Sequence, residues 1–381
     1  MNPRARTYLI QGSLFLLTLV STTVAGTEWM YGRLFLDVNS GLGWAEIRNG
    51  LHYSVPFLAI LTVHEFGHYF TARYHQVRVT LPYYIPLWFG VGQSLGTLGA
   101  FIRIKDYVSS RKKYFDIGIA GPLAGFVLAL VVLWYGFTHL PPPEYIFTIH
   151  PEYKKFGLGF ARLAYNNIPS GERFTLGDNA IFWFFKTYVA DPARLPHKYE
   201  IFHYPYLLAG YFALFFTSLN LIPIGQLDGG HILYGLIGRR AFQTVAPVLL
   251  VGFAFYAGLG FFKPADFALT GDFDYLNQLG NLGLYILALY ISFQRINDNR
   301  TTALLLALSV VAGQFVVSLI WPTAEGYPGF LLFILILGRF LGVYHPETMD
   351  EKPLDPTRKV LGWLALLIFI LCFSPKPFVT G

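Results

Sequence analysis

The chain has 381 residues, of which 54% are hydrophobic and only 13% are charged. Soluble domains carry about 25% charged residues, so the composition argues against a water-soluble fold. The formal net charge of +6 does not indicate nucleic-acid binding, because the basic residues cluster at the ends of apolar runs. Cys372 is the one cysteine, which excludes an intrachain disulfide and a cysteine-based metal site.

Nine apolar segments approach or exceed the length of about 20 residues that a membrane-spanning helix needs. They cover about residues 8–26, 51–72, 115–137, 206–236, 243–262, 279–294, 301–320, 328–343 and 359–373. Eight spans are the alternative, because the sixth segment is short and Pro223 interrupts the fourth. The predicted fold is therefore an all-α polytopic membrane protein with about nine transmembrane helices.

The first segment follows two arginines, a pattern that is also typical of a signal peptide. Its apolar part is long for a signal peptide, and residues 24–27 make a poor cleavage site, so we expect a retained helix. Lysines and arginines concentrate in every second loop, for example at 111–113 and 239–240. By the positive-inside rule, the N-terminus is predicted to be cytoplasmic and the C-terminus to lie outside.

The stretch from Leu81 to Ile104 is apolar but rich in proline and glycine, which argues against a helix through it. Its second half, "GTLGAFIRI" at 96–104, alternates in a way that is typical of a strand. Irregular backbone at membrane depth survives only where protein or a water-filled cavity surrounds it. We therefore predict a re-entrant β-hairpin beside a buried functional site, with a plain interfacial loop as the alternative.

The second segment contains "HEFGH", which puts His64, Glu65 and His68 into an otherwise apolar run. A charged side chain near the middle of a membrane helix costs roughly 2.5–3.5 kcal/mol, so these residues need a reason to be there. Positions i and i+4 lie on one face of a helix, and two imidazoles placed in this way can share one Zn²⁺. Glu65 would then be close enough to reach a zinc-bound water, as in the His-Glu-x-x-His arrangement of metalloproteases.

A catalytic zinc takes three protein ligands and keeps one position open. Asp228 is a candidate third ligand, because it lies in an apolar segment that Pro223 and Gly225 interrupt. Two neutral imidazoles and one carboxylate would leave a net charge near +1, which lowers the cost of burying the ion. His231 is a rival ligand, since it follows Asp228 by three residues and histidine is the commonest metal ligand. Spacing alone does not choose between the two.

Three stretches of the sequence resemble the site-2 protease family of intramembrane zinc metalloproteases. They are "HEFGH" at 64–68, "FDIGIAGPLAGF" at 115–126 and "NLIPIGQLDGG" at 220–230. Their order and spacing match the family, and "GTLGAFIRI" occupies the position of its membrane-inserted β-hairpin. The resemblance covers about residues 50–240. It points to the branch without a recognisable PDZ domain that occurs in cyanobacteria, plastids and many other bacteria.

The resemblance implies that His64, His68 and Asp228 hold one Zn²⁺ per chain and that Glu65 is the catalytic residue. It also implies that Asn220 helps to hold substrate near the metal. We expect the hairpin to bind substrate by strand pairing, through Gly96, Thr97, Gly99 and Ala100. The predicted organisation is an N-terminal transmembrane helix and outer loop (1–49), a catalytic core (50–240) and C-terminal transmembrane helices (241–381).

The predicted function is cleavage of peptide bonds in or near the transmembrane segments of membrane-protein substrates, as in regulated intramembrane proteolysis. The partners would be these substrates and the lipid bilayer, without nucleic acid. The active-site end would face the cytoplasm, in a bacterial inner membrane or alternatively in an organelle membrane.

Three other functions are compatible with buried histidines and carboxylates in a membrane protein. A metal-ion transporter would need them, but it does not explain Glu65 between two histidines. A di-iron hydroxylase uses many paired histidines, whereas one such pair lies in a predicted span. A catalytically inactive family member that binds helices is disfavoured by the intact set of metal residues.

Overall fold

A computed structural model describes residues 2–37, 41–165, 173–268, 272–297 and 299–380. Within these ranges the chain is mostly helical, with two small sheets of two strands each. It divides into two compact units. The first unit consists of Met1–Val108, Ile119–Asn220 and Leu367–Gly381, and the second of Ser109–Gly118 and Leu221–Leu366.

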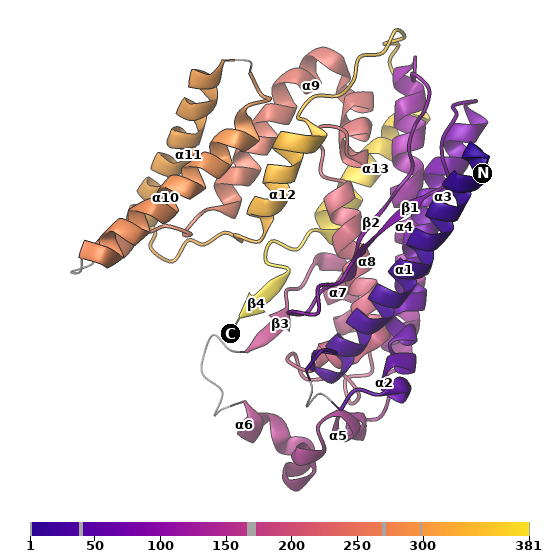
Figure 1. Cartoon of the computed structure of the whole chain (residues 1–381), viewed down its shortest axis with the longest axis vertical. Helices are drawn as coiled ribbons and strands as arrows, with labels where there is room; N and C mark the ends of the chain where they lie inside the picture. Colours follow the sequence, from indigo (N-terminus) through magenta and orange to yellow (C-terminus); the bar gives the residue numbers. More distant parts are fainter. Residues whose placement is uncertain (1, 38–40, 166–172, 269–271, 298, 381) are drawn as a thin grey trace. The chain divides into compact units, whose positions relative to one another are not determined.

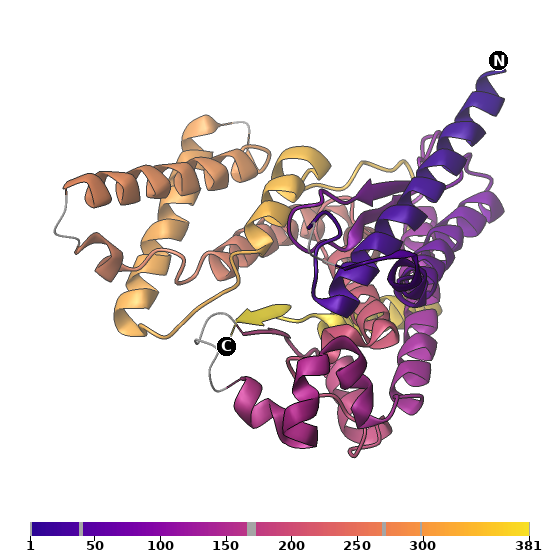
Figure 2. The ribbon, with the colours of Figure 1, turned by 60° about the horizontal axis from the view of Figure 1, so that its bottom comes forward.

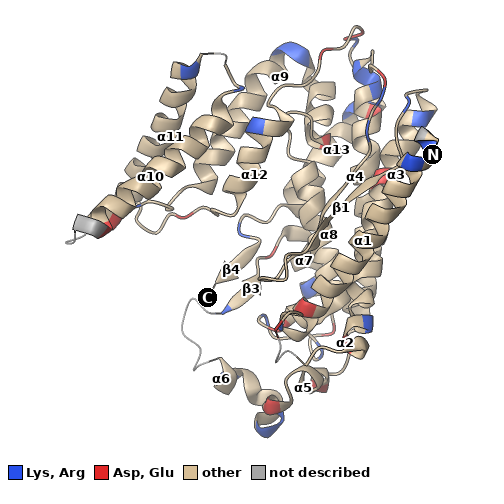
Figure 3. Ribbon diagram, viewed as in Figure 1, with Lys and Arg blue, Asp and Glu red and all other residues tan. Residues whose placement is uncertain are grey.

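Five helices in the described ranges are long and apolar enough to cross a membrane. They are α1 (Pro3–Tyr31), α4 (Arg111–Thr138), α9 (Asp228–Ala257), α10 (Asp272–Phe293) and α11 (Arg300–Ile320). Charged side chains lie mostly at helix ends and in loops (Figure 3), and Arg239 and Arg240 within α9 directly follow its kink at Gly238. These features agree with the predicted helical membrane protein.

The other predicted spans correspond to helices that are shorter or less apolar. α3 (Leu51–Tyr74) has 24 residues but carries the polar "HEFGH" group. α8 (Pro205–Asn220) has 16 residues and α13 (Pro356–Cys372) has 17. α12 (Phe330–Ile336) continues into the π-helical turn η6 (Leu337–Leu341).

The predicted segment at 206–236 is not one helix. α8 ends at Asn220 and α9 begins at Asp228, because Pro223 has no N–H to donate and Gly225 takes a left-handed conformation at φ 61°. The predicted gap between 236 and 243 contains a kink rather than a loop. The backbone is non-helical at Gly238, where φ is 76°, and α9 runs on past it to Ala257.

In the first unit, α3 packs against α1 and α8. The short helix α2 (Trp44–Asn49) leads into α3. Thr22 Oγ1 on α1 and Ser54 Oγ on α3 lie 2.8 Å apart and share a hydrogen bond. A Cβ at Gly26 would lie only 2.5 Å from the ring of Tyr53, so the glycine lets α1 and α3 approach closely. This contact fixes α3 along its N-terminal half.

The predicted β-hairpin is present and consists of β1 (Tyr83–Leu87) and β2 (Gly96–Phe101). The strands are antiparallel, with Tyr84 opposite Ala100 and a shift in register before Pro86 pairs with Thr97. Proline cannot donate to the ladder, which accounts for the irregularity at Pro86. Figures 1 and 2 both show the hairpin beside α1, which it contacts over both strands.

Side chains of α1 and α3 hold the hairpin by its backbone. Ser21 Oγ donates to the carbonyl of Gly96 at 2.6 Å, and Trp29 Nε1 donates to the carbonyl of Ser94 at 2.8 Å. Tyr53 on α3 donates from its hydroxyl to the carbonyl of Leu95 at 3.0 Å. Three donors from two helices therefore fix the segment that enters β2.

The buried carboxylate of Glu28 on α1 fixes the other arm of the hairpin. It accepts hydrogen bonds from Trp88 Nε1 at 3.0 Å and from the Phe35 backbone N–H at 2.9 Å. Glu28 is fully buried, and a buried carboxylate is tolerated only where donors satisfy it. The position of the hairpin is thus determined by α1.

Between α4 and α8 the first unit contains a series of short elements. They are η1 (Pro143–Tyr145), α5 (Ile146–Ile149), η2 (Pro151–Gly159), α6 (Phe160–Ala164), β3 (Phe174–Leu176), α7 (Ala180–Phe184), η3 (Phe185–Val189) and η4 (Ile201–His203). Ile146, Phe160 and Tyr165 form a small hydrophobic core. β3 pairs antiparallel with β4 (Phe378–Thr380) near the C-terminus.

In the second unit, α9 packs against α11 and α12, and α10 packs against α11. The turn η5 (Pro264–Phe267) precedes α10. The segment between η6 and α13 is tied to α9, because Tyr234 shares a 2.8 Å hydrogen bond with Thr348. Arg358 at the start of α13 donates to both carboxylate oxygens of Asp116 at 2.6 and 2.8 Å.

Candidate metal centre

The two histidines of "HEFGH" face each other on α3. His64 Nε2 and His68 Nε2 lie 3.0 Å apart, and the two residues are only 5% and 7% exposed. Two ligands of a tetrahedral Zn²⁺ lie about 3.3 Å apart, given zinc–nitrogen distances of about 2.0–2.1 Å. The helical i, i+4 spacing therefore places the imidazole nitrogens at the separation that a shared zinc ion requires.

Glu65 lies beside this pair and is equally buried, at 5% exposure. Its Oε1 is 4.0 Å from His64 Nε2. A carboxylate at this distance is close enough to reach a water held between the two imidazoles. The arrangement suits a group that exchanges a proton with such a water.

Glycines of α4 provide the space for both imidazoles. A Cβ at Gly121 would lie 2.5 Å from two ring carbons of His68, and one at Gly125 would lie 3.0 Å from His64 Cβ. On α3, a Cβ at Gly67 would lie 2.7 Å from the backbone oxygen of Ala120, so the two helices are in contact there. The glycines of "FDIGIAGPLAGF" thus explain how α4 can lie directly against the histidine pair.

Asn220 is the last residue of α8 and approaches the same pair. Its Nδ2 lies 3.4 Å from His64 Nε2. The predicted site residues His64, Glu65, His68 and Asn220 are therefore brought together within the first unit. An amide at this position can donate a hydrogen bond to a group bound between the histidines.

Asp228 belongs to the second unit, where it is the first residue of α9 and follows the irregular stretch 221–227. An acidic residue in the first turn of a helix is also stabilised by the helix dipole, so its position has a purely structural explanation too. His231 lies one turn later, and its Nδ1 is 2.7 Å from His345 Nε2. The ring of His231 also stacks on Tyr114.

His345 lies outside the predicted spans, in the segment before α13. Burial, and next the neighbouring His231, lowers the pKa of His345 to about 3. The ring of His345 stacks on Tyr234, with 3.8 Å between the ring centroids. No pattern in the sequence indicates this contact, because residues 231 and 345 are far apart along the chain.

The four predicted hairpin residues differ in exposure. Gly96 and Gly99 have positive φ angles of 80° and 103°, a conformation in which glycine is favoured. Thr97 is fully buried, and its hydroxyl donates to the carbonyl of Ile85 at 2.7 Å. Leu98, between Thr97 and Gly99, is 57% exposed, so its side chain is accessible on β2, as is that of Phe101 at the end of the strand.

Comparison with known proteins gives several matches. The sequence model of peptidase family M50 matches residues 52–259. The probable zinc metalloprotease EGY2, chloroplastic, of Oryza sativa subsp. indica is 30% identical over 204 residues, which is 54% of this chain and 32% of that protein. The probable zinc metalloprotease EGY1, chloroplastic, of Arabidopsis thaliana is 27% identical over 250 residues, which is 62% of this chain and 41% of that protein.

The matches cover about a third to two fifths of the length of these curated relatives. No solved structure matches the chain. The matched region of the family model includes α4, α8, α9 and all of α3 except Leu51, and thus every residue predicted to bind the metal. This match extends over more than half of the chain and agrees with the resemblance seen in the motifs. The chain therefore belongs to peptidase family M50, the site-2 protease family.

Proposed function

We propose that this chain is an intramembrane zinc metalloprotease that cleaves peptide bonds in or near transmembrane segments of other membrane proteins. The observation that carries the proposal is the buried pair of imidazole nitrogens, 3.0 Å apart, with Glu65 beside it on an apolar helix. Membership of family M50 and the relatives described as probable zinc metalloproteases support the same activity.

His64 and His68 would hold the zinc ion through Nε2, and Asp228 would supply the third ligand. A carboxylate offsets part of the charge of a buried dication, which a third neutral imidazole would not do. The contacts of His231 with His345 and Tyr114 give that histidine a packing role of its own. These contacts favour Asp228 over His231 as the ligand.

Bound zinc would supply a water of lowered pKa and would polarise the scissile carbonyl. Glu65 would accept a proton from that water at Oε1 or Oε2 and deliver it to the leaving amine. Asn220, with Nδ2 close to His64 Nε2, would donate a hydrogen bond to the substrate backbone beside the metal. The buried position of Glu65 and both histidines would limit the access of bulk water to this reaction.

The hairpin would present β2 to an extended stretch of substrate. A transmembrane helix hides its carbonyls in its own hydrogen bonds, so it has to unwind before cleavage, and pairing with a strand stabilises the unwound form. Gly96, Thr97, Gly99 and Ala100 would contribute backbone groups, while the exposed Leu98 contacts the substrate. A photocrosslinking side chain at Leu98 that never captures a cleaved substrate would contradict this role.

The membrane arrangement extends beyond the five apolar helices. We propose that α3, α8, α12 with η6, and α13 also lie in the bilayer, which gives about nine spans with a re-entrant hairpin. The N-terminus and the active-site end would face the cytoplasm or the equivalent side of an organelle membrane. Residues 1–49, 50–240 and 241–381 would serve as N-terminal anchor, catalytic core and C-terminal helices.

The test uses the purified full chain, loaded with zinc and reconstituted with two single-span model substrates. One span carries Asn and Pro at its centre, which weaken the helix, and the other is a matched polyleucine span. We expect cleavage of the first span only, loss of cleavage after chelation, and recovery when zinc is returned. A zinc-loaded chain that cleaves neither span would contradict the proposal.

A further inference from the structure

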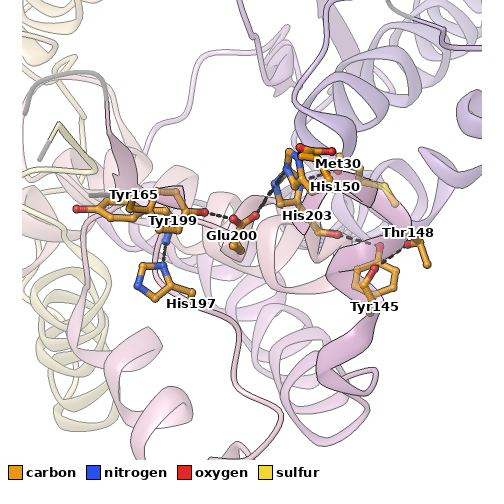
Figure 4. A network of polar contacts seen from close by, with 10 residues as sticks. Met30, Tyr145, Thr148, His150, Tyr165, His197, Tyr199, Glu200 and His203 are labelled. Atoms are coloured by element: carbon orange, nitrogen blue, oxygen red, sulfur yellow. Dashed lines mark hydrogen bonds and ion pairs between the residues drawn. The ribbon is translucent and has the colours of Figure 1, made fainter. Parts of the chain in front are cut away.

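A second group of potential metal ligands lies in the region between α4 and α8, far along the chain from "HEFGH". It consists of His150, Glu200 and His203, all within the first unit (Figure 4). Glu200 and His203 are almost completely buried, with side-chain exposures of 2% and 8%, and His150 is 25% exposed. The proposed protease reaction uses none of these residues.

The three side chains direct one ligand atom each toward a common point. His150 Nε2 lies 3.3 Å from His203 Nε2, and Glu200 Oε2 lies 3.0 Å from His203 Nε2 and 3.8 Å from His150 Nε2. Ligands of a tetrahedral zinc ion lie about 3.3 Å apart. The three observed distances bracket this value.

Hydrogen bonds to the other ring nitrogens orient both imidazoles. His203 Nδ1 lies 2.6 Å from the carbonyl oxygen of Met30, which can only accept, so Nδ1 carries the proton. His150 Nδ1 lies 3.0 Å from Glu152 Oε1, an arrangement that also places the proton on Nδ1. In the neutral rings the lone pairs of both Nε2 atoms therefore face Glu200.

Glu200 contributes a buried acceptor to the same point. Its Oε1 accepts a hydrogen bond from the hydroxyl of Tyr165. Its Oε2 is buried and accepts no hydrogen bond within the described part of the chain. Three acceptor atoms that converge in a buried place require a cation between them, either a metal ion or an added proton.

The surrounding charges favour a dication. Glu152 adds a second carboxylate beside His150, so Glu200 and Glu152 together balance a charge of +2. The ring of Tyr153 stacks on His150 and holds the imidazole in place. A cavity of about 240 Å³ borders His150 and His203 and also Arg173, and it leaves room for a water as the fourth ligand.

We propose that His150 Nε2, His203 Nε2 and Glu200 Oε2 bind a second divalent transition-metal ion, most simply Zn²⁺. Each ligand has an outer partner that fixes it, as is usual for metal ligands: Met30, Glu152 and Tyr165. Because Met30 lies at the end of α1, the ion connects that helix to the region between α4 and α8. The number of zinc ions per chain is then two, instead of the one that the sequence predicts.

The experiment counts zinc in a full-length variant that lacks the "HEFGH" pair, His64→Ala/His68→Ala, after equilibration with micromolar zinc and dialysis. We expect about one zinc ion to remain in this background. Adding Glu200→Gln keeps the size of the side chain. It should lower the zinc affinity by more than the roughly 10–100-fold that the loss of an outer partner of a metal ligand costs. Adding His139→Ala, an exposed histidine of the same region, should leave the zinc in place.

The count in this background is independent of whether the protein is a protease. His150→Ala provides a second variant, because this partly exposed residue can be replaced with little effect on packing. Circular dichroism checks that each variant is folded. A background variant that binds no zinc at these concentrations would overturn the proposal. Full zinc affinity in a folded Glu200→Gln or His150→Ala variant would also overturn it. The cation among these three side chains would then be a proton that the histidines share with Glu200.

Discussion

The substitution Gly121→Ala tests the metal centre through its packing, without altering any proposed ligand. The new Cβ would lie 2.5 Å from both Cδ2 and Cε1 of His68, whereas ordinary van der Waals contact begins at 3.4 Å. The imidazole therefore has to move by roughly 1 Å to avoid the methyl group. A metal site tolerates deviations of only about 0.2 Å in its distances. We expect zinc affinity to fall by at least 10-fold and proteolysis to fall with it.

The helix itself should not suffer from this substitution, since alanine in a helix is favoured over glycine by about 0.5–1 kcal/mol. Gly12→Ala on α1 is the matched control, because no atom lies within 4 Å of its Cβ. Gly125→Ala should be intermediate, with its Cβ 3.0 Å from His64 Cβ. The assay is zinc affinity in a Glu200→Gln background, together with helix content by circular dichroism. A folded Gly121→Ala variant with zinc affinity equal to that of Gly12→Ala would refute the reasoning.

Three further predictions concern single side chains. Glu65→Gln should retain zinc, and its turnover should fall by at least about 10²–10⁴-fold, which is the usual cost of removing a general base. Cleavage within a few-fold of wild type would exclude Glu65 from the reaction. Asp228→Asn should lower the zinc affinity of the "HEFGH" site much more than His231→Ala does. The opposite ranking would make His231 the ligand. The pKa of His345 is about 3 in the folded chain and about 6.5 in an unfolded chain, so the unfolded state takes up the proton first. Stability should therefore fall as the pH drops from about 6.5, and thermal unfolding should show a weaker fall in His345→Gln.

The pattern of the sequence predicted the elements that depend on local spacing. The pair His64 and His68 needs only a helix. The hairpin needs only the alternating strand pattern at 96–104 and the proline and glycine residues that argue against a helix. The break inside the segment 206–236 was also predicted from local signals, because Pro223 and Gly225 interrupt the apolar run. Average hydropathy alone does not report such a break, since it depends on the backbone geometry of a few residues.

Contacts between distant parts of the chain could not be predicted in this way. His150 and His203 lie 53 positions apart along the chain, and neither lies in a motif. Their convergence on Glu200 depends on how the region between α4 and α8 folds back on itself. The contact between His231 and His345 has the same origin, since 114 residues separate them. Periodicity carries no information on such pairs.

The attachment of the hairpin to α1 has a consequence for where a minimal protein begins. The match to the family starts at residue 52, so α1 lies outside it. Yet Ser21, Glu28 and Trp29 hold both arms of the hairpin through hydrogen bonds to its backbone and to Trp88. A fragment trimmed to the matched region would carry both strands and lack these three anchoring groups. The boundary of the family match therefore does not coincide with the boundary of these contacts, and a fragment that keeps the hairpin anchored has to begin at the first helix.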